Sequence, residues 1–167
     1  MAVRRRTRSR RSGRDQGAAA VEMALVMPIL FMMLIGIINY GLWFNDSLSL
    51  REGVRESARQ AVVWNLTGCT GTNMAAVACV ARAQIGATGR SYVKVMAPNG
   101  WVKGQEVVVC GMVKSVNFTG FVPLPAGGLI ESKTSMSIES VTPMPTDTNP
   151  YADTLPTGGD WTWCTTA

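Results

Sequence analysis

Residues 22–46 read EMALVMPILFMMLIGIINYGLWFND, and this stretch decides how the chain is organised. Between Glu22 and Asp46 it contains no charged residue and is rich in Leu, Ile, Met, Val and Phe. A helix rises about 1.5 Å per residue, so roughly 20 apolar residues cross about 30 Å of hydrocarbon. The run from 23 to 44 has that length, and we therefore predict a membrane-spanning helix.

The flanks of this run predict its orientation. Seven arginines lie in the first fourteen residues: Arg4, Arg5, Arg6, Arg8, Arg10, Arg11 and Arg14. Because basic residues near a span keep their side in the cytoplasm, we expect the N-terminus inside and the C-terminal domain outside the cytoplasmic membrane. At the outer end we expect an aromatic anchor in the membrane interface, formed by Tyr40, Trp43 and Phe44. A cleaved secretory signal is the alternative, although its apolar core is usually only about 7–15 residues long.

The rest of the chain has balanced charge. From Met23 onward there are nine basic and nine acidic residues, so the basic character of the protein belongs to its first residues. We therefore expect membrane lipid rather than nucleic acid as a partner.

Four cysteines follow the span on its exported side, where disulfides form and persist. They allow three connectivities, of which we favour Cys69 with Cys79 by proximity and Cys110 with Cys164 by elimination. A zinc site is disfavoured, because the chain has no His and no closely spaced Cys pair. The lack of His also excludes Ser-His and Cys-His catalysis, so we predict no enzyme, no metal, no cofactor and no small-molecule substrate, while chemistry by acidic residues alone stays open.

Apolar patterning outside the span predicts an α+β fold that is pilin-like. A long helix over 18–64 continues out of the membrane, and a second helix over 73–85 starts at Asn73 as its cap. Alternating β-branched residues predict an antiparallel sheet with strands at 91–96, 101–116 and 131–141. The expected organisation is a basic leader at 1–17, the membrane and assembly helix at 18–64, an extracytoplasmic domain at 65–141 and a Pro/Gly/Thr-rich tail at 142–167. Asn99-Gly100 is a turn signal between the first two strands. The tail is expected to have little regular structure and to be tied down, if at all, by Trp161, Trp163 and Cys164.

A single carboxylate in the apolar helix needs a physical explanation. Glu22 lies at the start of the span, where an ionisable group is costly and usually has a partner. If a peptidase cuts after Gly17, the new α-amino group of Ala18 is a cation at neutral pH and can pair with Glu22 of the same or a neighbouring subunit. A snorkelling interfacial residue is the alternative interpretation of Glu22.

The residues around this carboxylate resemble a known family. Gly17, Glu22, Ala24-Leu25-Val26, Pro28, Gly36, Gly41 and Arg55-Glu56-Ser57-Ala58-Arg59 are similar to the TadE-like minor pseudopilins of tight-adherence (Flp-type) pilus systems, a branch of the type IV pilus superfamily. The resemblance covers about residues 14–64. Family members commonly have Glu-Phe where this chain has Glu22-Met23, and often an acid in place of Asn39.

The resemblance implies a role in assembling an adhesive pilus. It implies leader cleavage between Gly17 and Ala18 by a membrane aspartyl prepilin peptidase, with Glu22 as the assembly carboxylate. The expected partners are that peptidase, other pilins or pseudopilins and the inner-membrane assembly platform. The alternative function is an uncleaved single-span envelope protein that binds surface material, with Trp161 and Trp163 as contacts.

Overall fold

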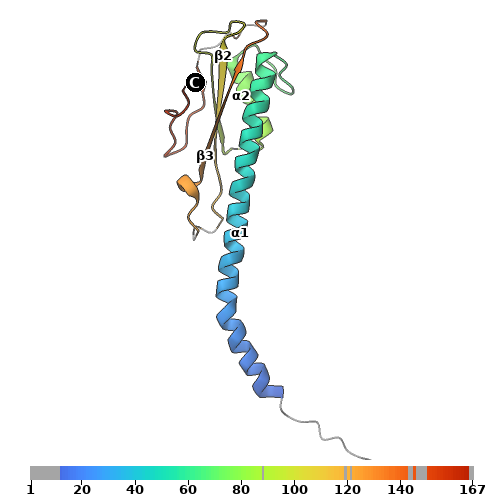
Figure 1. Cartoon of the computed structure of the whole chain (residues 1–167), viewed down its shortest axis with the longest axis vertical. Helices are drawn as coiled ribbons and strands as arrows, with labels where there is room; N and C mark the ends of the chain where they lie inside the picture. The colour runs from blue at the N-terminus through green and yellow to red at the C-terminus, as the bar shows by residue number, and fades with distance from the viewer. Residues whose placement is uncertain are drawn as a thin grey trace, which may run out of the picture. The chain divides into compact units, whose positions relative to one another are not determined.

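The computed structural model describes residues 12–87, 89–118, 120, 122–142, 145 and 150–165, and of residues 12–16 it describes the backbone alone. The first eleven residues of the predicted leader lie outside this range. In chain order the elements are α1 (Ser12–Val62), α2 (Met74–Ile85), β1 (Ser91–Met96), β2 (Glu106–Lys114), a 3-10 turn η1 (Pro125–Gly128), β3 (Leu129–Ser137) and β4 (Tyr151–Ala152). The fold is α+β, as predicted (Figure 1).

Helix α1 begins and ends at other residues than predicted. It starts at Ser12 instead of Ala18, and it ends at Val62 instead of Trp64. The early end has a local cause, because Trp64 has a left-handed φ of 51° and the Asn65 amide donates to the Gln60 carbonyl at 3.0 Å. This turn sends the chain away from the helix axis.

The chain forms two compact units, which divide α1 between Ile38 and Asn39. The first unit contains the N-terminal half of α1. The second unit, Asn39–Ala167, contains the rest of α1 together with the sheet and α2. The predicted span therefore continues into the globular unit, because its residues from Asn39 to Phe44 belong there.

The sheet has the strand order β3-β2-β1-β4, and all its pairs are antiparallel. Strand β1 has the predicted bounds, whereas β2 and β3 are shorter than predicted. The connection between β1 and β2 is a loop over 97–105 and not a tight Asn-Gly hairpin. Trp101, predicted in a strand, instead lies buried in this loop and donates its indole N–H to the Ser140 carbonyl at 3.0 Å.

Central strand β2 is buried on both faces, since alternate residues point to opposite sides. One face carries Val107, Val109 and Val113 and packs under the distal part of α1 and under α2. The other face carries Val108 and Cys110 and packs under the C-terminal segment. Figure 1 shows α1 on one side of the sheet and the C-terminal segment on the other.

Two glycines allow α1 to approach its neighbours closely. A Cβ on Gly53 would lie 2.6 Å from Cγ1 of Ile85, and one on Gly111 would lie 2.7 Å from Leu50 and from Val54. The core is built around these contacts from one face of α1, which carries Leu50, Val54, Ala58, Ala61 and Val62.

Helix α2 is capped at both ends. Asn73 accepts a hydrogen bond from the Ala76 amide at 3.0 Å, which confirms the predicted N-cap. At the other end Gly86 has a φ of 69° and its amide donates to the Arg82 carbonyl. The small apolar residues between these caps let α2 pack on β1 and α1.

Candidate functional site

The N-terminal half of α1 carries an apolar surface that the described residues of the chain leave uncovered. Every residue from Gly17 to Leu34 is exposed, and none of the most apolar 18-residue window is buried. The helix is long and apolar enough to cross a membrane. A core helix of similar composition would be mostly buried, so this surface must be covered by lipid or by other helices. One long apolar helix of this kind suggests a single-pass membrane protein.

The residues predicted to mature and assemble the protein lie on this uncovered helix. Gly17, Ala18 and Glu22 are all exposed, and they are part of one continuous helix. Ala18 and Glu22 are four residues apart, so they lie on the same face. From Ala18 to Asn45 the chain has no Lys or Arg, and Glu22 is the only acidic residue. This surface therefore offers one carboxylate and lacks a cation of its own.

Both disulfides join the pairs that the sequence analysis favoured. Cys69–Cys79 joins the loop after α1 to α2. Cys110–Cys164 joins β2 to the C-terminal segment across 54 residues. The second bond holds the predicted tail against the sheet.

The C-terminal tail has little regular structure, as predicted, since β4 is the only strand or helix among its described residues, but residues 151–164 are held against the sheet. Strand β4 pairs with β1, with Val95 opposite Tyr151 and Lys94 opposite Ala152. Trp161 and Trp163 pack against the sheet near Val108 and Cys110. Their indole N–H groups donate to the carbonyls of Asp153 and Asp160, at 3.4 and 2.9 Å. These contacts give both side chains a packing role, so no structural observation favours them as ligand contacts.

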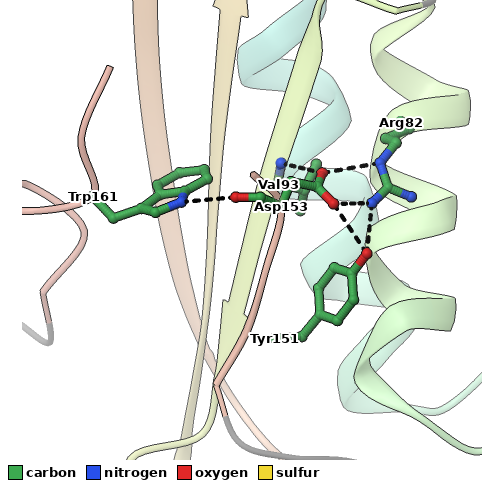
Figure 2. Close-up of polar contacts among 5 residues, drawn as sticks. All are labelled: Arg82, Val93, Tyr151, Asp153 and Trp161. Carbon is green, nitrogen blue, oxygen red and sulfur yellow. Dashed lines mark hydrogen bonds and ion pairs between the residues drawn. The ribbon is translucent and has the colours of Figure 1, made fainter. Parts of the chain in front are cut away.

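A partly buried ionic cluster fixes the start of this segment (Figure 2). Asp153 forms an ion pair with Arg82 of α2, and its Oδ2 accepts hydrogen bonds from Arg82 Nε at 3.1 Å and from the Val93 amide at 2.9 Å. Arg82 Nη2 donates to the Tyr151 hydroxyl at 2.9 Å, and this hydroxyl donates to Asp153 Oδ1 at 3.0 Å. Burial lowers the pKa of Arg82, but the hydrogen bonds from Arg82 to Asp153 and Tyr151 outweigh it and raise that pKa. We call Arg82, Tyr151 and Asp153 the tail latch.

The tail latch was missed in the sequence because its partners are about 70 residues apart. No local motif joins an arginine in a short helix to an Asp in a Pro-rich segment. The latch borders a hollow of about 530 Å³ lined by Arg82, Ala83, Gly89, Ser91, Tyr92, Asp153 and Thr154. Its two charged residues neutralise each other, which leaves the hollow without a free charge among the residues that line it. Within the described ranges, no group of three acidic or Cys side chains could hold a metal ion.

Comparison with known proteins finds a similarity that covers most of α1. A family model described as TadE-like protein matches residues 17–59. Searches of curated proteins and of solved structures found no match. The matched segment starts at Gly17, contains Glu22 and ends at Arg59, inside the resemblance noted from the sequence. The resemblance is thus confirmed: residues 17–59, about a quarter of the chain, are similar to the TadE-like family.

Proposed function

We propose that this protein is a minor pilin or pseudopilin that takes part in assembling an adhesive Flp-type pilus. The TadE-like family suggests a protein associated with Tad pili, and it is a family of structural pilus components and not of enzymes. In this proposal a prepilin peptidase removes residues 1–17, and α1 then packs among the helices of other pilins and of the inner-membrane assembly platform.

The observation that carries the proposal is the uncovered apolar helix with its single carboxylate. A hydrocarbon environment makes an unpaired Glu22 costly. Cleavage before Ala18 places a new α-amino cation one helical turn away, or beside the Glu22 of a neighbour. Pairing of these charges compensates part of the desolvation of both, so assembly is favoured once the leader is gone.

The mature N-terminus tests the cleavage step. Intact-mass analysis of protein extracted from membranes that contain the peptidase should give a chain beginning at Ala18. Gly17→Val should block cleavage, while Gly36→Val serves as the control, because both positions have open space around a new side chain. A wild-type chain that retains residues 1–17 beside the active peptidase would refute the maturation step.

The role of Glu22 is tested separately. Glu22→Ala should still be cleaved but should fail to co-purify with pilins and should reduce piliation, because the α-amino group loses its partner. Glu52→Ala is the matched control, since Glu52 is an exposed acid on the same helix outside the predicted span. Normal piliation by Glu22→Ala would contradict the pairing mechanism.

A further inference from the structure

The globular unit contains a loop without charge that lies beside the uncharged part of α1. The loop from Ser115 to Gly128, which connects β2 to β3, has fourteen residues and includes no Asp, Glu, Lys or Arg. The loop is fastened to α1 by two hydrogen bonds. The Phe118 amide donates to Oδ1 of Asn39 at 3.0 Å, and the Tyr40 hydroxyl donates to the Pro123 carbonyl at 3.3 Å. Figure 1 shows the loop running along α1 below the sheet.

The loop contacts α1 at residues that the sequence places inside the membrane span. Asn39, a polar residue in an apolar run, has no exposed surface, and the loop supplies one of its partners. The segment from Met23 to Ile38 contains sixteen residues and rises only about 24 Å, short of about 30 Å of hydrocarbon. Because the predicted span starts at Met23, its hydrocarbon extends beyond Ile38 to the level of Asn39 and Tyr40, where the loop is attached.

The first charged groups of the globular unit mark the aqueous side of this level. Asp46 on α1 forms an ion pair with Arg90 at 3.2 Å, and Arg90 also donates to the Lys114 carbonyl. Asn39 precedes Asp46 by seven residues, about 10 Å of helix rise. The interfacial region adds roughly 5–8 Å on each side of the hydrocarbon, so a loop 10 Å below a hydrated ion pair lies at the boundary of headgroups and acyl chains.

Exposed apolar side chains surround this level. Phe118 is 75% exposed, and the other members of what we call the apolar rim are also open to their surroundings: Tyr40, Leu42, Phe44 and Val116. Trp43, by contrast, packs against the protein core, which corrects its predicted place in the aromatic anchor. An exposed Phe side chain is unfavourable in water, whereas aromatic rings are favoured at the membrane interface.

We propose that the loop after β2 is a second membrane contact, in which Phe118 inserts into the outer leaflet of the membrane that α1 spans. The occupant of the apolar rim is lipid, because Tyr40, Leu42 and Phe44 continue the uncharged run of α1. The loop that carries Val116 and Phe118 has no charged residue either. Two attachments, α1 and the loop, then restrict how the globular unit can tilt at the membrane surface. The inference rests on the membrane placement of α1, but not on leader cleavage or on the role of Glu22.

Lipid-based quenching tests this contact in the full chain. A single environment-sensitive fluorophore is attached through Phe118→Cys, Val116→Cys, Met32→Cys or Val102→Cys, and each protein is reconstituted into phosphatidylcholine and phosphatidylglycerol vesicles with nitroxide-bearing acyl chains. Val102 is the matched control, an exposed apolar residue in the β1–β2 loop. Met32 reports on the span itself.

We expect labels at 118 and 116 to lose emission to the nitroxide lipid and to shift to shorter wavelength, as the label at 32 does, while the label at 102 stays unquenched. If the label at 32 is quenched while the labels at 118 and 116 stay unquenched like the label at 102, the loop contact is overturned and the membrane span still stands. Absence of quenching at 32 would overturn both this inference and the membrane placement in the proposed function. Shielding of the label at 118 by a neighbouring protein would give a blue shift without nitroxide quenching, which also counts against lipid.

Discussion

Replacing Gly53 by Ala should destabilise the globular unit, although alanine is the better helix former. Gly53 is buried where α1 meets the end of α2, and a new Cβ would lie 2.6 Å from Cγ1 of Ile85 and 2.9 Å from its backbone nitrogen. A side-chain tip can rotate away, but the backbone of Ile85 can move only if α2 shifts. We therefore expect the cost near the upper end of the range for overpacking, about 3 kcal/mol.

The helix propensity of alanine offsets about 1 kcal/mol of this cost, so the net loss should be about 2 kcal/mol. For a unit of this size that corresponds to a fall in Tm of roughly 6–10 °C. Gly41→Ala is the matched control, because Gly41 is in the same helix with nothing within 4 Å of a new Cβ. This control should be neutral or gain up to about 1 kcal/mol.

Thermal unfolding of the full chain in detergent, followed by fluorescence and near-ultraviolet dichroism, measures the effect. The edge-to-face pair of Trp64 and Trp101, with ring centroids 5.0 Å apart, lies in the core of the globular unit and reports on its packing. A Tm for Gly53→Ala equal to or above that of the wild type would refute the close approach of α1 and α2. Equal losses in Gly53→Ala and Gly41→Ala would show that the effect comes from the helix alone.

Three further predictions concern the end of α1 and the C-terminal segment. Hydrogen bonds from Arg59 and Gln60 lower the pKa of Glu56 from 4.5 to about 2, so the contribution of Glu56 to stability is present above pH 4.5 and is lost as the pH falls towards 2. Glu56→Gln should therefore flatten the dependence of Tm on pH between these values. An unchanged slope would contradict the lowered pKa of Glu56. Replacing Cys110 and Cys164 together by Ala should lower the free energy of unfolding by up to about 4 kcal/mol, because the disulfide closes a loop of 54 residues. It should also make the C-terminal segment sensitive to limited proteolysis, and protease resistance equal to that of the wild type would show that the bond does not hold the segment. Asp153→Asn should lower stability by about 1–3 kcal/mol, because it weakens a partly buried acceptor of charged hydrogen bonds. The same thermal assay measures this loss, and an unshifted Tm would argue against the tail latch.

The long helix, its apolar surface, the cap of α2 and the first strand were predictable because their signals are local. An uncharged run of membrane length, Asn73 before small apolar residues, and alternating β-branched residues at 91–96 each follow from short-range physics. The same locality explains the family resemblance, which rests on residues 17–59 and on the spacing of Gly17 and Glu22. The disulfide pairs agreed with the favoured choice, but proximity and elimination were weak grounds for it.

Tertiary structure alone decided how the distant segments meet. Residues 151–164 could not be placed from the sequence, because they are held by partners far away in the chain, namely Arg82, the edge of β1 and Cys110. In the same way, the sequence placed Asn39 and Trp43 in the membrane span. Only the folded structure shows that Asn39 accepts a hydrogen bond from the Phe118 amide and that Trp43 packs against the core. Sequence determined which residues avoid water, because hydrophobicity is a property of each side chain; the folded chain determined what covers them, because contact depends on where non-adjacent segments are brought together.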